Sequence, residues 1–152
     1  MITKRDLAAA VIAASITLAC VSMADEPGKL LDSTAWNWSD FTVKKTEVGE
    51  LRSVVRQPTR TLDELEMHIT TLNAGQSPHP PHTHPDEELL IVKEGNIESV
   101  LEGKTTPLGP GGIIFHASNQ PHTVRNTGTA PATYYVIKWN PPGMLKARQD
   151  SK

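Results

Sequence analysis

Short apolar runs alternate with polar and turn-forming residues along most of the chain after residue 50. Alternation of apolar and polar residues is typical of a half-buried strand, whereas a short continuous apolar run is typical of a buried one. The segment 65–70 alternates, and 89–92 and 113–115 are continuous apolar runs. No long helical period is present, so the pattern predicts an all-β fold. Further strands are expected at 51–55, 96–101, 105–108, 123–126 and 132–139.

Glycine and proline mark the turns between these segments. The chain has 10 glycines and 12 prolines among 152 residues, as expected for many short strands joined by turns. Glu102-Gly103-Lys104, for example, predicts a hairpin turn. The length favours one domain, and residues 61–140 are expected to form a small antiparallel sandwich or barrel of the jelly-roll type.

Residues 1–24 have the features of a secretory signal. A basic start at Lys4-Arg5 precedes an apolar core over 7–21, and residues 22–24 supply the small side chains that a signal peptidase recognises. We expect cleavage after Ala24, a periplasmic or secreted protein, and no membrane span in the mature chain. The alternative is an uncleaved N-terminal anchor.

The two ends of the mature chain are expected to flank the barrel. Residues 25–60 would form N-terminal edge strands and a loop, with Trp36 and Trp38 on an edge strand that covers one end of the core. An aromatic wall for a ligand is the alternative role of the two tryptophans. Residues 141–152 are expected to form a frayed polar tail.

Net charge and composition exclude some classes of function. The formal net charge of −2 at pH 7 offers no basic surface for nucleic acid. A charged fraction of 21% and a mean hydropathy of −0.34 fit a soluble globular protein. We expect no second domain, such as a DNA-binding helix pair, and this disfavours a transcription regulator.

Two histidines and a glutamate lie just before the apolar run 89–92. In an extended backbone, His82 and His84 point to the same face because they are two residues apart. Glu88 has the same parity, but a straight strand would place it about 13 Å from His84, too far for one ion with bonds of about 2 Å. If both bind one metal, the chain must bend at Pro85-Asp86, a dipeptide suited to a turn.

The stretch from His82 through Glu88 to Gly95 matches the spacing of the first motif of the cupin superfamily, which it resembles. In that family the motif binds a divalent metal ion together with a histidine from a second motif. The resemblance implies a cupin jelly roll, or double-stranded β-helix barrel. Imidazole and carboxylate ligands suit Mn²⁺, Fe²⁺, Co²⁺, Ni²⁺ or Zn²⁺. The implied metal ligands are His82, His84, Glu88 and His122.

The second motif lies between Gly111 and Asn126 and departs from the family pattern at two positions. Ala117 stands in place of a proline and Asn119 in place of a glycine. Asparagine tolerates a positive φ better than most residues, so we expect Asn119 to make the same turn as the glycine.

The remaining histidines are not expected to bind the metal. His68 lies on the polar side of the 65–70 strand and is expected to be a solvated or hydrogen-bonded surface residue. His79 is flanked by prolines and is expected to be a loop residue, with a supporting role at the mouth of the site as the alternative. His116 ends the 113–115 strand outside the ligand pattern, and we expect a structural role for it.

Open coordination positions on such a metal permit chemistry on a bound small molecule. Proteins with this resemblance include dioxygenases, decarboxylases, isomerases and ligand-binding modules, so the fold does not name one activity. We expect a metal-dependent enzyme acting on a polar organic small molecule; the alternative is a non-catalytic binding or sensing protein. We also expect a homodimer, paired through a Trp36–Phe41 strand or through the strand that contains Val54.

Overall fold

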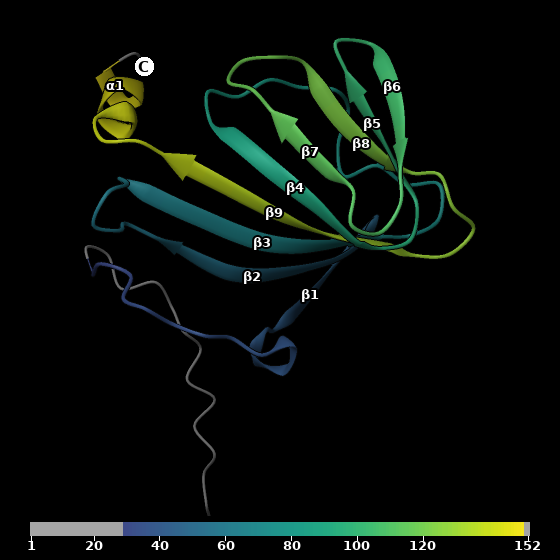
Figure 1. The fold of residues 1–152 in the computed structure, drawn as a ribbon, viewed down its shortest axis with the longest axis horizontal. Helices are drawn as coiled ribbons and strands as arrows, with labels where there is room; N and C mark the ends of the chain where they lie inside the picture. Colours follow the sequence, from purple (N-terminus) through teal and green to yellow (C-terminus); the bar gives the residue numbers. More distant parts are fainter. Residues whose placement is uncertain (1–28, 151–152) are drawn as a thin grey trace, which may run out of the picture.

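The computed structural model describes residues 29–150 and has an all-β fold, as the sequence pattern predicts (Figure 1). A short 3₁₀ helix, η1 (Trp38–Asp40), precedes the strands, and a helix, α1 (Met144–Asp150), follows them. Neither helix in this range is long and apolar enough to span a membrane. The expected signal segment lies outside the described residues. The strands are β1 (Val43–Thr46), β2 (Gly49–Gln57), β3 (Glu64–Leu72), β4 (Glu87–Glu94), β5 (Ile97–Leu101), β6 (Lys104–Leu108), β7 (Ile113–His116), β8 (His122–Asn126) and β9 (Ala132–Asn140).

The strands form two antiparallel sheets around a shared interior. The larger sheet has six strands in the order β1-β2-β3-β9-β4-β7, and the smaller has three in the order β6-β5-β8. Strand β9, the last in the chain, therefore lies between β3 and β4. Figure 1 shows the smaller sheet beside the β4–β7 end of the larger one. This sandwich encloses the space in which the candidate site lies.

Alternate residues of the inner strands point into this interior. In β4, Glu88 and Leu90 are buried while Leu89 is only half-buried. The β4–β5 turn requires glycine at Gly95, because its φ is +82° and a Cβ there would lie 2.6 Å from the Cα of Ala132. The buried apolar cluster draws on both sheets and comprises Leu72, Leu90, Val92, Ile97, Ile114, Val124, Ala132, Tyr134 and Val136.

The sequence expectation for the N-terminal tryptophans is wrong. Residues 38–40 form η1 rather than part of an edge strand. The Trp38 ring lies 4.7 Å from the Arg52 guanidinium carbon and 4.4 Å from the Lys93 ammonium, which are cation–π contacts. Trp38 therefore packs against charged side chains of β2 and β4, and neither it nor Trp36 lines the pocket described below.

Two further expectations about the periphery are wrong. The 113–115 run is not buried throughout, since Ile113 is 61% and Phe115 is 49% exposed. These residues lie on β7, the edge strand of the larger sheet, and stay exposed although the Phe115 ring stacks on that of Trp139, with centroids 6.4 Å apart. The segment expected to be a frayed tail is helical at α1. The strand containing Val54 is β2, which pairs with β3 along its length but with β1 only from Gly49 to Arg52, so its later part has no strand partner on the β1 side among the described residues.

Candidate metal centre

Three imidazoles converge where the loop before β4 meets the start of β8. His82 and His122 form a backbone bridge, each amide donating to the other's carbonyl at 3.1 Å. One ring nitrogen from each of His82, His84 and His122 lies within 4.8 Å of the others. The bridge therefore brings together two parts of the chain that are 40 residues apart, from position 82 to position 122.

Glu88 reaches this cluster from the inward face of β4. The chain bends at residues 85–86. This bend brings Glu88 close to His84, which a straight strand would hold about 13 Å away. Glu88 Oε2 lies 3.6 Å from His84 Nε2, and its Oε1 lies 3.5 Å from His122 Nε2. Asn119 has a φ of +59°, as predicted for a residue in the glycine position of the motif. Its backbone N–H donates to the His84 carbonyl at 2.8 Å. The second-motif turn thus supports the loop of the first motif.

Backbone hydrogen bonds determine which nitrogen of two imidazoles faces the cluster. His84 Nδ1 lies 2.9 Å from the Asp86 carbonyl oxygen, and His122 Nδ1 lies 2.7 Å from that of Gln120. A carbonyl only accepts, so each Nδ1 carries the hydrogen and each Nε2 keeps its lone pair.

Several buried nitrogens of the cluster lack a hydrogen-bond partner. They include Nε2 of His84, Nε2 of His122 and Nδ1 of His82. Buried polar atoms in proteins are almost always satisfied, so orphaned lone pairs beside a carboxylate are suited to a cation. The donor set fits a divalent metal ion with imidazole and carboxylate ligands.

The local electrostatics favour the protonation states that metal binding needs. Burial lowers the pKa of His122 to about 4, and burial followed by repulsion from His79 and His84 lowers the pKa of His82. Burial acts to raise the pKa of Glu88, but the His116 hydrogen bond and the Lys138 charge outweigh it and lower that pKa to about 2. At neutral pH His82 and His122 are therefore neutral and Glu88 is charged, as metal binding requires of its ligands.

The comparisons with known proteins agree with this fold. A family model described as a cupin domain matches residues 68–138. This part of the chain belongs to the cupin superfamily. Its structure is similar to the cupin domain of Schizosaccharomyces pombe Cnp3, with a TM-score of 0.60 and 12% identity over 76% of this chain and 80% of that one. It is also similar to the polyketide cyclase RemF of Streptomyces resistomycificus, with a TM-score of 0.59 and 22% identity over 73% and 82% of the two chains. At these identities the likeness shows the fold alone.

One curated relative is more similar in sequence over a short stretch. The cupin is 38% identical over 64 residues to the dimethylsulfoniopropionate lyase DddQ of Ruegeria pomeroyi. The match covers 41% of this chain and 31% of the relative. The chain thus matches less than a third of that protein's length.

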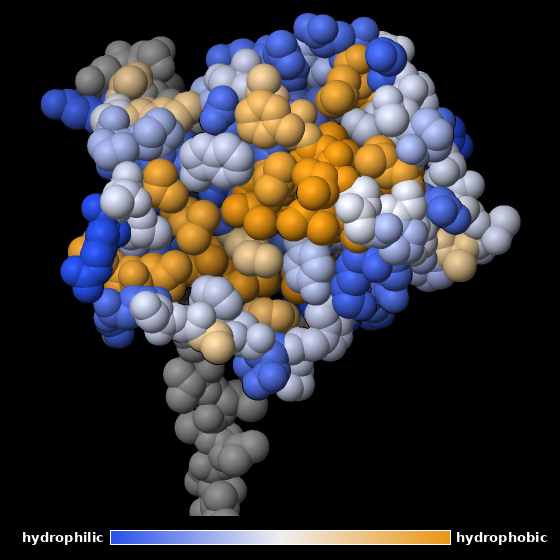
Figure 2. Space-filling view, in the orientation of Figure 1, coloured by the Kyte–Doolittle hydropathy of each residue, from blue (hydrophilic) through white to orange (hydrophobic). Residues whose placement is uncertain are grey.

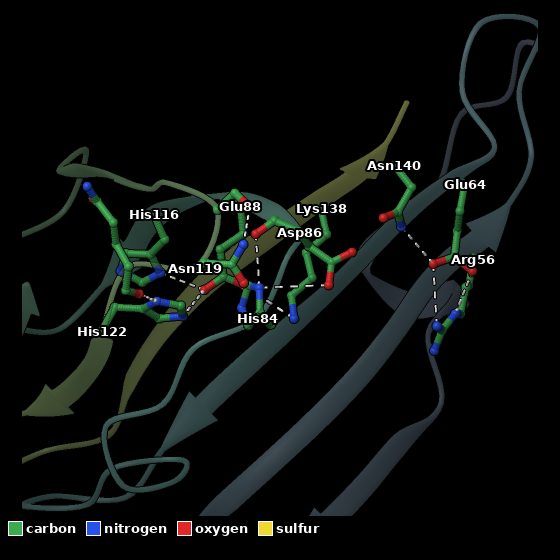
Figure 3. Close-up of polar contacts among 12 residues, drawn as sticks. Arg56, Glu64, His84, Asp86, Glu88, His116, Asn119, His122, Lys138 and Asn140 are labelled. Atoms are coloured by element: carbon green, nitrogen blue, oxygen red, sulfur yellow. Dashed lines mark hydrogen bonds and ion pairs between the residues drawn. The ribbon is translucent and has the colours of Figure 1, made fainter. Parts of the chain in front are cut away.

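Two residues that the sequence analysis did not place at the site hold the Glu88 carboxylate. His116 Nδ1 lies 2.6 Å from Glu88 Oε1, and Lys138 Nζ lies 3.3 Å from Oε2 (Figure 3). Both are the cross-strand partners of Glu88, His116 on β7 and Lys138 on β9. The sequence predicts a structural role for His116, outside the ligand pattern, but does not predict its contact with Glu88. No local signal reveals it, because the strand register brings these residues together.

A pocket of about 370 Å³ adjoins the cluster inside the cupin barrel. Its apolar walls include Leu51, Leu90, Val124 and Val136, and its polar groups include His68, Thr70, Tyr134 and Lys138. A mainly apolar pocket with a few polar groups is typical of a small-molecule site. The cluster residues His82, Glu88 and His122 form part of its wall.

The two other histidines differ in how well they match expectation. His68 is hydrogen-bonded, as expected, with Nδ1 2.6 Å from Glu66 Oε1, but it lines the pocket rather than the outer surface. The polar parity of β3 therefore faces the interior, because that interior contains the pocket. His79 is an exposed loop residue, and its ring lies 3.9 Å from the His82 ring in an edge-on contact.

Proposed function

We propose that this cupin is a metal-dependent enzyme acting on a polar organic small molecule, with the metal held by His82, His84, Glu88 and His122. The observation that carries the proposal is the convergence of unpartnered, buried imidazole nitrogens on a charged carboxylate at the wall of a pocket. A divalent ion bound there would supply a Lewis acid for a substrate oxygen or lower the pKa of a bound water.

We further propose that the reaction is that of a lyase on a small carboxylic acid. The short match to DddQ supports this class, and dimethylsulfoniopropionate is a small molecule with one carboxylate and one sulfonium group. The pocket volume of about 370 Å³ accommodates a molecule of that size. Lys138, whose side chain is 25% exposed, lines the pocket and offers the positive charge that would orient a carboxylate.

The polar groups deeper in the pocket are suited to orienting a substrate rather than to removing a proton. Burial raises the pKa of the Tyr134 phenol, so this group stays protonated near neutral pH. Tyr134 also interacts with Thr70, its cross-strand partner. The apolar walls around these groups exclude water from the bound molecule.

The proposal is tested with the metal-loaded full chain and a panel of small carboxylates that includes dimethylsulfoniopropionate. Consumption of substrate is followed by proton NMR, with the His122→Ala variant as the metal-deficient control. We expect wild type to consume at least one compound and His122→Ala to consume none. Binding seen as a raised melting temperature without consumption would instead favour the alternative, a non-catalytic binding or sensing cupin.

We also propose export and a homodimer. Export rests on the signal-like segment 1–24, and mass spectrometry of the mature N-terminus tests it.

For the dimer, the structure favours β7 as the contact, because Ile113 and Phe115 are exposed on that edge strand. Figure 2 shows apolar side chains gathered over the β4 and β9 part of the molecule. Light scattering of wild type and of Phe115→Glu should give a dimer mass and a monomer mass.

A further inference from the structure

His116 is a buried polar residue that lies beside the proposed metal ligands and is not one of them. Its exposure is 2%, and it ends β7 directly opposite Glu88 on β4. Its Nδ1 contacts Glu88 Oε1 at 2.6 Å, while its Nε2 has no hydrogen-bond partner. A carboxylate at that distance accepts, so the hydrogen is on Nδ1 and the imidazole is the donor.

Two roles are compatible with these contacts, because Glu88, His116 and His122 also form a group whose atoms lie within 4.8 Å of one another. In the first role His116 is itself a metal ligand; in the second it holds Glu88 for the metal. The ring orientations decide between them. The rings of His116 and His122 are stacked, with centroids 4.0 Å apart and an interplanar angle of 23°.

An imidazole binds a metal in the plane of its ring, at about 2 Å from the nitrogen. The planes of two stacked, nearly parallel rings intersect much farther from the rings than a metal–nitrogen bond of about 2 Å. In this arrangement His116 and His122 therefore cannot both bind one ion. In contrast, the His122 plane is inclined by 60° to that of His82 and by 80° to that of His84. Steeply inclined planes intersect close to the rings, which allows a shared ion.

We infer that His116 is a positioning residue that holds the Glu88 carboxylate in the orientation the metal requires. Lys138 contacts the other carboxylate oxygen at 3.3 Å from the neighbouring strand on the opposite side. The carboxylate is therefore restrained from both sides by the sheet register, and His116 supplies the shorter, buried contact. This inference rests on the proposed metal site and goes beyond its four ligands.

A matched pair of amides tests the inference. In His116→Asn the side-chain nitrogen occupies the place of Nδ1 and can still donate to Glu88. In His116→Gln the amide lies farther out, in the place of Nε2, and cannot make the same bond. Both variants are polar and similar in volume, and circular dichroism and melting of the metal-free proteins check that they fold.

The readouts are the dissociation constant for Co²⁺ in the metal-free full chain and the visible spectrum of bound Co²⁺ at saturation. Loss of an outer partner typically weakens metal binding 10–100-fold, so we expect about that loss in His116→Gln. In His116→Asn we expect a change of about threefold or less, because the donor is retained. The spectrum at saturation should match wild type in both, because the ligands are the same.

The other outcomes separate the two proposals. If both amides lose as much affinity as His122→Ala and change the Co²⁺ spectrum, His116 is a ligand and the inference is overturned. If both bind Co²⁺ as wild type does, Glu88 needs no support from His116 and the inference is equally wrong. If wild type itself does not bind Co²⁺, Zn²⁺, Mn²⁺, Fe²⁺ or Ni²⁺, the proposed metal function fails.

Discussion

Two histidine–glutamate pairs make the same contact in different surroundings, and the histidine of each lines the same pocket. In one, His116 Nδ1 lies 2.6 Å from Glu88 Oε1; in the other, His68 Nδ1 lies 2.6 Å from Glu66 Oε1. The first pair joins β7 to β4 and its side chains are only 2% and 8% exposed. The second pair lies within β3, and its side chains are 21% and 19% exposed.

The difference between the pairs lies in what else the carboxylate touches. Glu88 also lies within 4 Å of His84, His122 and Lys138, and its pKa is lowered to about 2. Glu66 is not part of any group of close potential metal ligands among residues 29–150. A short histidine–carboxylate bond is therefore no sign of a metal site by itself. Its location beside further unpartnered nitrogens is what distinguishes the first pair.

The largest effect on metal binding should follow from removing a ligand beside the first pair. In His122→Ala we expect the metal dissociation constant to rise by well over about 100-fold, more than the range seen for outer partners. Elemental analysis after dialysis should find wild-type protein loaded and the variant nearly empty. The circular dichroism spectrum of the variant should remain that of a folded β protein. Retention of full metal by His122→Ala would remove His122 from the ligand set.

The pH dependence of stability should also reflect the first pair's surroundings. The folded pKa of His122, about 4, lies below its ordinary value of 6.5, because burial disfavours the charged form. The unfolded chain thus binds more protons at this residue, and the metal-free protein should lose stability as pH falls from about 6.5 to 4. Glu88, with its pKa lowered to about 2, should add a loss below its ordinary value of 4.5.

This pH prediction can be isolated with His122→Asn, which keeps a donor near the Gln120 carbonyl but has no titrating ring. Melting temperatures of the metal-free proteins between pH 7 and pH 4 should fall less in the variant than in wild type. Equal slopes in the two proteins would mean that His122 is not held neutral by burial.

Asn126 provides a comparison in which stability changes and the metal site does not. It is fully buried, and its amide donates to the carbonyls of Leu72 and Ala130 at 3.0 and 2.8 Å. Its Oδ1 also accepts from the Gly128 amide at 2.9 Å. We expect Asn126→Ala to lower the free energy of unfolding by about 2–4 kcal/mol because several buried groups lose partners.

The metal dissociation constant of folded Asn126→Ala should stay close to that of wild type. Chemical denaturation measures the first quantity and Co²⁺ titration the second. A large loss of Co²⁺ affinity in this variant would mean that metal binding responds to general destabilisation. The contrast between the two histidine–glutamate pairs would then need a different explanation.

Local patterns in the sequence predict the position of two long central strands well. The 65–70 segment, in which apolar and polar residues alternate, lies in β3, and the β-branched and aromatic segment 132–139 lies in β9. The same reasoning failed for Ile113 and Phe115, which are apolar but lie on an exposed edge. Apolar character alone does not reveal whether a neighbouring element covers a strand.

The candidate site divides in the same way into local and long-range parts. The shared face of His82 and His84, and the bend that Glu88 needs, follow from spacing within one short segment. The contact of Glu88 with His116 joins residues 28 positions apart through strand register, which no local pattern shows. The polar parity of His68 predicts a surface position, whereas that face of β3 lines the pocket.

The smallest effect on metal binding should come from breaking the second pair. His68→Leu removes the bond to Glu66 but touches none of the proposed ligands, so we expect the Co²⁺ dissociation constant to change by about twofold or less. Co²⁺ titration beside His116→Gln makes the comparison direct, because each variant loses one histidine–glutamate bond of 2.6 Å. If His68→Leu weakens Co²⁺ binding as strongly as His116→Gln, the two pairs contribute equally to metal affinity. The contact with Glu88 would then not explain the effect of His116. An unchanged Co²⁺ affinity together with altered binding of a small carboxylate would place His68 on the substrate side of the pocket.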